Sequence, residues 1–204
     1  MKNTHLFSRV GIFLALLLVT SSLYGQCPSD ITPTNVGWHD TTASTTVLCG
    51  SVGTCTITVS FCWRALPGIG GSTLYETYMY NIDENCDGCG NYTWQDIFSM
   101  SMKLTYQTLG SGVPGCGDVN TMTWQGYRPP CWKRSSTGNG FTACSTGTDS
   151  YCEEICSLCY ASGIVYSSSC TWTTIGTPPC SGYPPPSPWT LTDTNCYQID
   201  CGIF

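Results

Sequence analysis

The most regular pattern along the chain is an alternation of apolar and polar residues over positions 54–64, TCTITVSFCWR. The apolar face of this segment is made of Cys55, Ile57, Val59, Phe61 and Trp63. β-branched and aromatic residues that recur with a period of two are typical of a half-buried strand. A second run at 74–82, LYETYMYNI, follows a Gly-rich loop, so we predict that the two segments form a hairpin.

Residues 93–110 fit two patterns. The alternation of Phe98, Met100 and Met102 with polar residues fits a strand. The same segment also forms an apolar helical stripe, and Thr93 with Asp96 resembles a capping box. Because the segment is longer than an ordinary strand, we predict a helix near 93–108.

Shorter runs predict further strands at 119–127, 159–166 and 170–175. The glycine-rich stretch 110–117 predicts a loop and an internal boundary. The segments together predict a mainly β protein, with small antiparallel sheets or a sandwich and one helix near 93–108. We expect this fold to be rich in loops and in disulfides.

The beginning of the chain predicts export. Lys2 and Arg9 precede the uncharged run VGIFLALLLV, and a stretch of small and polar residues ends at Gly25. This order is typical of a secretory signal peptide. An apolar core of about ten residues is too short to span a bilayer, which needs roughly twenty. We therefore predict a signal peptide at 1–25 and an extracellular domain at 26–204, secreted or at the cell surface, without a membrane span.

The cysteine content determines how we expect this domain to be stabilised. All 16 cysteines follow the predicted signal peptide, and an even number in an exported chain favours disulfides. Cys55 and Cys62 are seven positions apart on one strand, so they should face opposite ways and bond to different partners. We expect eight disulfides among Cys27, Cys49, Cys55, Cys62, Cys86, Cys89, Cys116, Cys131, Cys144, Cys152, Cys156, Cys159, Cys170, Cys180, Cys196 and Cys201.

Two cysteine pairs have the C-x-x-C spacing, Cys86/Cys89 and Cys156/Cys159. In a cytosolic protein this spacing would indicate a zinc site, whereas export favours disulfides. The proline-rich segment 177–189 predicts an extended surface strap held through Cys180.

Few residues suggest catalysis. His39, beside Asp40, is the one histidine after the signal peptide, and neither Ser44 nor Ser51 lies in a nucleophile-elbow motif. Two pairs of adjacent carboxylates, Glu153-Glu154 and Asp83-Glu84, could serve a hydrolase. Adjacent residues on a strand point to opposite faces, so we expect neither pair to converge.

One segment resembles the opening of a calcium loop. Asp83, Asn85 and Asp87 precede Gly88 with the spacing D-x-N-x-D-G. The twelfth position should be a bidentate Glu and is Trp94. Because this ligand is missing, we favour the alternative, a turn rich in Asp, Asn and Gly without calcium or any other cofactor.

Charge and aromatic content indicate the class of partner. After the signal peptide, five basic and 13 acidic residues remain, which argues against nucleic acid. We interpret the one basic cluster, Lys133-Arg134, as a solvated turn. Aromatic, uncharged surfaces suit extracellular protein or carbohydrate. The candidate contact residues lie near predicted loops, with core packing as the alternative for each: Trp38, Trp124, Trp132 and Trp189.

These observations predict a secreted non-enzymatic protein, acting as a structural component of the cell surface or as a binding module. A secreted hydrolase that uses distributed carboxylates is one alternative, and a disulfide-rich effector or inhibitor is another. The signal peptide ending before Gln26, the strand TCTITVSFCWR, the run YETYMYNI and the later PPCWK resemble cysteine-rich exported proteins of Bacteroidota-type bacteria. No activity is known for that group, so the resemblance implies export and no particular reaction.

Overall fold

The computed structural model describes only part of the 204 residues. The predicted signal peptide lies outside the described residues, as do Ser51, Asp87, Gly88 and Cys89. The described residues are 27–28, 36–49, 53–68, 72–86, 92–118, 122–135, 139–144, 149–187, 189 and 193–202.

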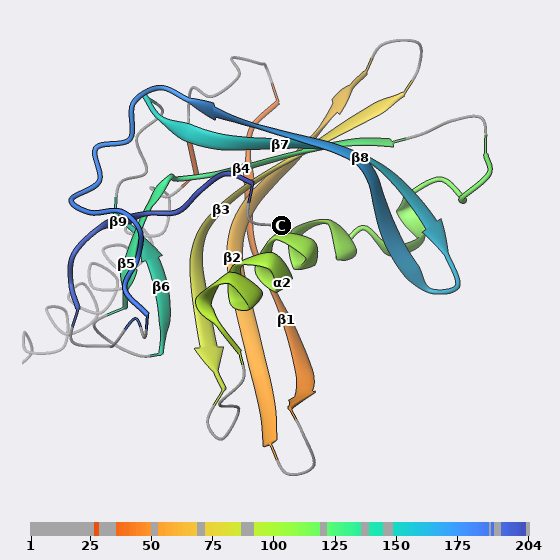
Figure 1. Ribbon diagram of the computed structural model, residues 1–204. Helices are drawn as coiled ribbons and strands as arrows, with labels where there is room; N and C mark the ends of the chain where they lie inside the picture. The colour runs from red at the N-terminus through yellow and green to blue at the C-terminus, as the bar shows by residue number, and fades with distance from the viewer. Residues whose placement is uncertain are drawn as a thin grey trace, which may run out of the picture.

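The described strands join in one curled sheet, so the predicted mainly β fold is confirmed, as a single sheet in place of several small ones (Figure 1). The sheet order is β8-β7-β4-β3-β6-β5-β9, with β2 and then β1 added on the other side of β3. The strands are β1 (His39–Cys49), β2 (Gly53–Pro67), β3 (Thr73–Asn85), β4 (Met122–Arg128), β5 (Cys131–Arg134), β6 (Gly140–Ala143), β7 (Tyr151–Ala161), β8 (Ile164–Ile175) and β9 (Tyr197–Gln198).

The predicted hairpin is confirmed by the antiparallel pairing of β2 with β3. The face of β2 that the alternation marked as apolar is buried, and Ile57, Val59 and Phe61 have no exposed surface. The register of the pair shifts between Ser60 and Phe61, which leaves Tyr80 of β3 as an extra residue. A bulge of this kind bends the strand and increases its twist.

The sheet divides into two wings at β3. The first half of β3 pairs in parallel with β4, and its second half pairs antiparallel with β6. Pro129 and Pro130 separate β4 from β5, and proline cannot donate to a sheet ladder. The chain therefore leaves one wing (β4, β7 and β8) and enters the other (β6, β5 and β9) at this point.

One predicted strand is wrong. Residues 159–166 cross the turn between β7 and β8, which pair antiparallel as a long hairpin. Ser162 and Gly163 have positive φ angles of 52° and 85°, the left-handed conformation that tight turns require. The predicted strands at 119–127 and 170–175 fall largely on β4 and β8.

The predicted helix is confirmed as α2 (Trp94–Gln107). Thr93 and Asp96 form the capping box, in which Asp96 N donates to Thr93 Oγ1 at 3.3 Å and Thr93 N donates to Asp96 Oδ2 at 2.8 Å. A short 3₁₀ helix, η3 (Gly110–Gly112), follows in the segment predicted as a loop.

Helix α2 packs against one face of the sheet, where it contacts β1, β2, β3 and β8 (Figure 1). We call this side of the sheet the helix face and the other side the outer face. The helix face holds most of the buried apolar residues, with aromatic contacts such as Phe98–Trp132 at 4.9 Å between ring centroids. A smaller cluster of Cys62, Tyr78, Tyr80 and Tyr127 lies on the outer face.

Within the described part of the chain, seven disulfides link 14 cysteines, which confirms the disulfide-stabilised fold. Cys55 bonds to Cys86 and Cys62 to Cys27, so the two cysteines of β2 have different partners, as predicted. The other bridges are Cys116–Cys159, Cys131–Cys180, Cys144–Cys196, Cys152–Cys201 and Cys156–Cys170.

The bridge from Cys180 to Cys131 ties the proline-rich strap to β5, as predicted. Such a dense set of bridges fits an extracellular protein, because thiols are kept reduced in the cytosol. Within the part of the chain that the structure describes, no helix has the length and apolar character needed to cross a membrane.

Candidate functional site

The four tryptophans proposed as contact residues lie mostly in the interior. Trp124 and Trp132 are fully buried and Trp189 is 7% exposed, so core packing describes these three. Trp38 is half-buried on the outer face, where the Arg64 guanidinium lies 4.3 Å from its ring centroid. None of the four presents an open aromatic surface.

The candidate catalytic groups do not converge. His39 and Asp40 are adjacent on β1, with the His39 ring 4.8 Å from Trp63 while Asp40 accepts from the Tyr80 hydroxyl at 2.7 Å on the outer face. Ser44 hydrogen bonds with Thr58 at 2.8 Å. These contacts hold the groups in separate places, which is not the geometry of a nucleophile and its base.

Both pairs of adjacent carboxylates are divided between the two faces, as predicted. Glu84 accepts from Arg134 at 3.0 Å, while Asp83 accepts from Asn81 at 3.2 Å.

Arg134 is itself 9% exposed in β5, so the prediction of a solvated turn at Lys133-Arg134 is wrong. The long side chain of Arg134 packs over the Phe141 ring, and its guanidinium reaches the Glu84 carboxylate.

The calcium motif does not begin in a loop. Asp83 and Asn85 are residues of β3 and lie opposite Thr58 and Thr56 of β2, whereas Asp87 is outside the described residues. The first ligands of a calcium loop have to wrap around the ion, and an extended strand directs them along one face instead.

The C-x-x-C cysteines bond outside their own pairs. Cys86 joins Cys55, Cys156 joins Cys170 and Cys159 joins Cys116. Zinc binds thiolates, and these three sulfurs are in disulfides.

A group of residues on the helix face of the β4–β7–β8 wing combines Glu154, one of the predicted hydrolase carboxylates, with Gly126 and Trp172, which the sequence did not single out. Gly126, Glu154 and Trp172 are direct neighbours across β4, β7 and β8, so they form one row on one face. The buried Trp124 indole covers Gly126, because a Cβ at Gly126 would lie 2.3 Å from a Trp124 ring carbon. Glu154 therefore lies between one buried indole and the Trp172 indole, which is 54% exposed.

Two cations lie near the Glu154 carboxylate. Burial raises the pKa of Glu154, and the charges of Arg128 and Lys103 partly oppose this rise. Arg128 is fully buried, which lowers the pKa of its guanidinium to about 10, and it donates to the backbone oxygen of Asp200. Lys103 reaches the site from the exposed side of α2.

The Glu154 carboxylate lacks a strong donor. Among the described residues, its one close polar contact is Cys156 Sγ at 3.6 Å. That sulfur belongs to the Cys156–Cys170 disulfide and carries no hydrogen to donate. A half-buried carboxylate that receives no strong hydrogen bond from the protein is available to accept one from a ligand.

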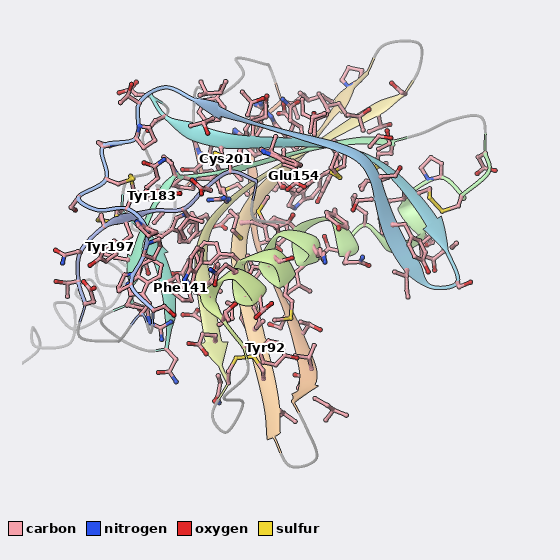
Figure 2. The ribbon with its side chains drawn as sticks, in the orientation of Figure 1. Tyr92, Phe141, Glu154, Tyr183, Tyr197 and Cys201 are labelled. Atoms are coloured by element: carbon pink, nitrogen blue, oxygen red, sulfur yellow. A yellow bond between two sulfur atoms is a disulfide. The ribbon has the colours of Figure 1, made fainter. Side chains whose placement is uncertain are left out.

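The end of the described chain closes one side of the site. Cys201 bonds to Cys152, which lies two residues before Glu154 on the same face of β7, and Thr174 donates to Cys201 Sγ at 2.9 Å. Gly202 lies against Trp172, since a Cβ at Gly202 would be 2.4 Å from Trp172 Nε1. Figure 2 shows Glu154 and Cys201 on the side of β7 and β8 that faces α2.

One sequence signal could have found this site. Trp172 alternates with Thr171 and Thr173 in a predicted strand, and Thr174 follows at i + 2, so the polar residues on this side of Trp172 suit an exposed position. Comparisons of the chain with protein-family models, with curated proteins and with solved structures found no match. The chemistry of the site therefore rests on its own residues: an open indole, an acceptor carboxylate and two nearby cations.

Proposed function

We propose that the protein is an exported, non-enzymatic carbohydrate-binding module whose ligand contacts Trp172 and Glu154. The observation that carries this proposal is the cross-strand pairing of a half-exposed indole with a carboxylate that lacks a strong donor. The Cys156–Cys170 and Cys152–Cys201 disulfides cross-link the strands beside the site, so we expect the two side chains to be held in place before a ligand arrives.

Trp172 supplies the apolar part of the contact. An indole offers a large flat area at a low cost in conformational entropy, because only two side-chain torsions have to be fixed. Gly202 and the Cys152–Cys201 bridge support the ring from one side. The C–H face of a pyranose ring is a flat apolar surface of matching kind.

Glu154 supplies the polar part, and its neighbours select against cations. A sugar hydroxyl can donate to the carboxylate and supply the missing hydrogen bond. An ammonium ligand could also combine an indole with a carboxylate. Here Glu154 and Asp200 balance the positive charges of Lys103 and Arg128, so the site has no excess negative charge to attract a cation, which favours a neutral polyol.

The two alternatives find less support. A hydrolase of the two-carboxylate kind needs a second acid that faces Glu154. Glu153 points to the outer face, where it accepts from Gln125, and Asp200 accepts from Tyr183 at 2.7 Å. An inhibitor acts through a protruding rigid segment, whereas Trp172 and Glu154 lie on a face of the sheet within paired strands.

The test is binding of soluble cello-, xylo-, manno- and chito-oligosaccharides to the oxidised protein, measured by calorimetry and tryptophan fluorescence. We expect at least one series to bind, and Trp172→Ala to weaken it by about tenfold or more, since loss of 1.4 kcal/mol corresponds to tenfold. Tyr166→Ala is the matched control, because Tyr166 is 47% exposed on β8 but faces the other side of the sheet.

Three results would overturn the proposal. These are no binding by any neutral oligosaccharide, equal binding by wild type and Trp172→Ala, or preferential binding of a lysine or choline probe. Release of shorter oligosaccharides during the incubation would instead identify a hydrolase.

A further inference from the structure

Tyr183 is the most exposed tyrosine or tryptophan in the described part of the chain, at 60%. It lies in the proline-rich strap, which the Cys131–Cys180 disulfide ties to β5. The backbone beside it is also fixed, since Gly182 accepts a hydrogen bond from Gln198 N at 2.9 Å. A ring that is exposed on a fixed backbone contributes little to the core and is available to a ligand.

The hydroxyl of Tyr183 is held by the end of the described chain. It donates to Asp200 Oδ2 at 2.7 Å, while the Asp200 backbone oxygen accepts from Arg128. The bond to Asp200 fixes the ring at the end opposite to its backbone, so Tyr183 is oriented before a ligand arrives. Asp200 is exposed, and a carboxylate has a second oxygen that can accept a hydrogen bond from a ligand.

The segment that holds Tyr183 also reaches the Trp172 indole. Asp200, Cys201 and Gly202 are consecutive, and a Cβ at Gly202 would lie 2.4 Å from Trp172 Nε1. Two steps along a chain separate Cα atoms by at most about 8 Å. The two most exposed rings on this part of the surface are therefore joined by one short segment.

The carboxylates of the two places are connected in the same way. Burial lowers the pKa of Arg128, and the charges of Glu154 and Asp200 partly oppose this effect, so Arg128 lies near both carboxylates. Figure 2 shows Cys201 between Glu154 and Tyr183 in this view. Glu154 and Asp200 thus lie on either side of one buried guanidinium.

We propose that Tyr183 and Asp200 form a second sugar subsite, and that the ligand is a chain of several pyranose units that lies along residues 200–202. This inference rests on the proposed function, in which Trp172 and Glu154 form the first subsite. Each subsite pairs an exposed aromatic ring with a carboxylate. A polysaccharide chain presents the same kinds of C–H face and hydroxyl group at every unit, so a repeating ligand suits both subsites.

The surface between the two rings leaves room for such a chain. Gly202 has no side chain, and Cys201 is 8% exposed because its sulfur is in the bridge with Cys152. A monosaccharide could fill only one subsite. A ligand that spans both makes the second contact within the same molecule, which raises the affinity without any change in the first contact.

The experiment is calorimetry of the oxidised protein with cello-, xylo-, manno- and chito-oligosaccharides, from disaccharide to hexasaccharide. In a series that binds, we expect the affinity to rise by about tenfold or more with chain length, because a longer ligand reaches the second subsite. Tyr183→Ala should remove this rise and leave disaccharide binding as in wild type, which also shows that the variant is folded. Trp172→Ala should weaken binding at every length.

Two further variants serve as controls. Tyr183→Phe keeps the ring and should keep most of the rise, and Tyr166→Ala removes an exposed tyrosine from the other side of the sheet and should keep all of it. Affinity that is independent of chain length, a rise that survives Tyr183→Ala, or one that either control abolishes would overturn the second subsite alone. Absence of binding by every series would overturn the carbohydrate function and this subsite together.

Discussion

Glu154 and Trp172 lie directly opposite each other on β7 and β8, on the face of the sheet that carries α2. The two residues are separated in the sequence, and the antiparallel pairing of β7 with β8 makes them neighbours. Glu154 is also the carboxyl group on this face whose pKa burial raises. This combination makes its titration a test of the site.

We expect the free energy of unfolding to fall as the pH rises through the interval between the ordinary and the raised pKa of Glu154. In that interval the native protein holds the proton and the unfolded chain has lost it, so raising the pH favours unfolding. Glu154→Gln should remove this dependence and be more stable at neutral pH. Urea unfolding at a series of pH values measures this pH dependence of the free energy of unfolding. Glu153→Gln, on the opposite face of the sheet, is the control.

Gly126→Ala should destabilise the protein by about 1–3 kcal/mol, the range for overpacking a dense core. The new Cβ would lie 2.3 Å from the Trp124 ring, which is held by a 3.0 Å hydrogen bond from its Nε1 to Thr77. Gly37→Ala is the control, because nothing lies within 4 Å of a Cβ there. Equal urea midpoints for the two variants would contradict the packing described for Trp124.

Loss of either partner of the Arg64–Glu76 ion pair should cost about 3–5 kcal/mol, because the remaining charge stays buried. The two side chains are 2% and 1% exposed, and Glu76 also accepts from the Tyr127 hydroxyl at 3.3 Å. We expect Arg64→Met/Glu76→Leu to be closer to wild type than either single variant. Unfolding in urea compares the three, and additive losses would argue against a buried pair.

The protein should lose stability above pH 10 as its buried tyrosines resist ionisation. Burial raises the pKa of Tyr75 to about 12 and also raises those of Tyr78, Tyr80, Tyr106 and Tyr127. The native state keeps these protons while the unfolded chain releases them, so rising pH favours unfolding. As the pH is raised, the absorbance of phenolate should therefore increase only above pH 10 and together with unfolding. The tyrosines of the denatured protein should titrate near pH 10.

Cys49 and Cys89 should form the eighth disulfide. The other 14 cysteines are paired in the structure, so these two are left for each other. Proteolysis of the unreduced protein followed by mass spectrometry should find one peptide pair that joins them. Two free thiols, or a bridge from either residue to another cysteine, would refute the assignment.

The sequence by itself determined the elements whose signals are local. The alternation over 54–64 predicted β2 and its buried face, because a pleated strand repeats every two residues. Thr93 and Asp96 predicted the start of α2, because a capping box uses only neighbouring residues. The cysteine count predicted a disulfide-stabilised domain, and the pleat separated the partners of Cys55 and Cys62.

Only the tertiary structure decided which residues are exposed and which meet. Trp124 and Trp172 both lie in strands with polar neighbours, yet one is fully buried beneath α2 and the other is 54% exposed at an edge. Local periodicity assigns a residue to a face of its strand but not the strand to the centre or edge of the sheet. That position, like the disulfide partners, depends on pairing between distant segments, whose register and order no local pattern encodes.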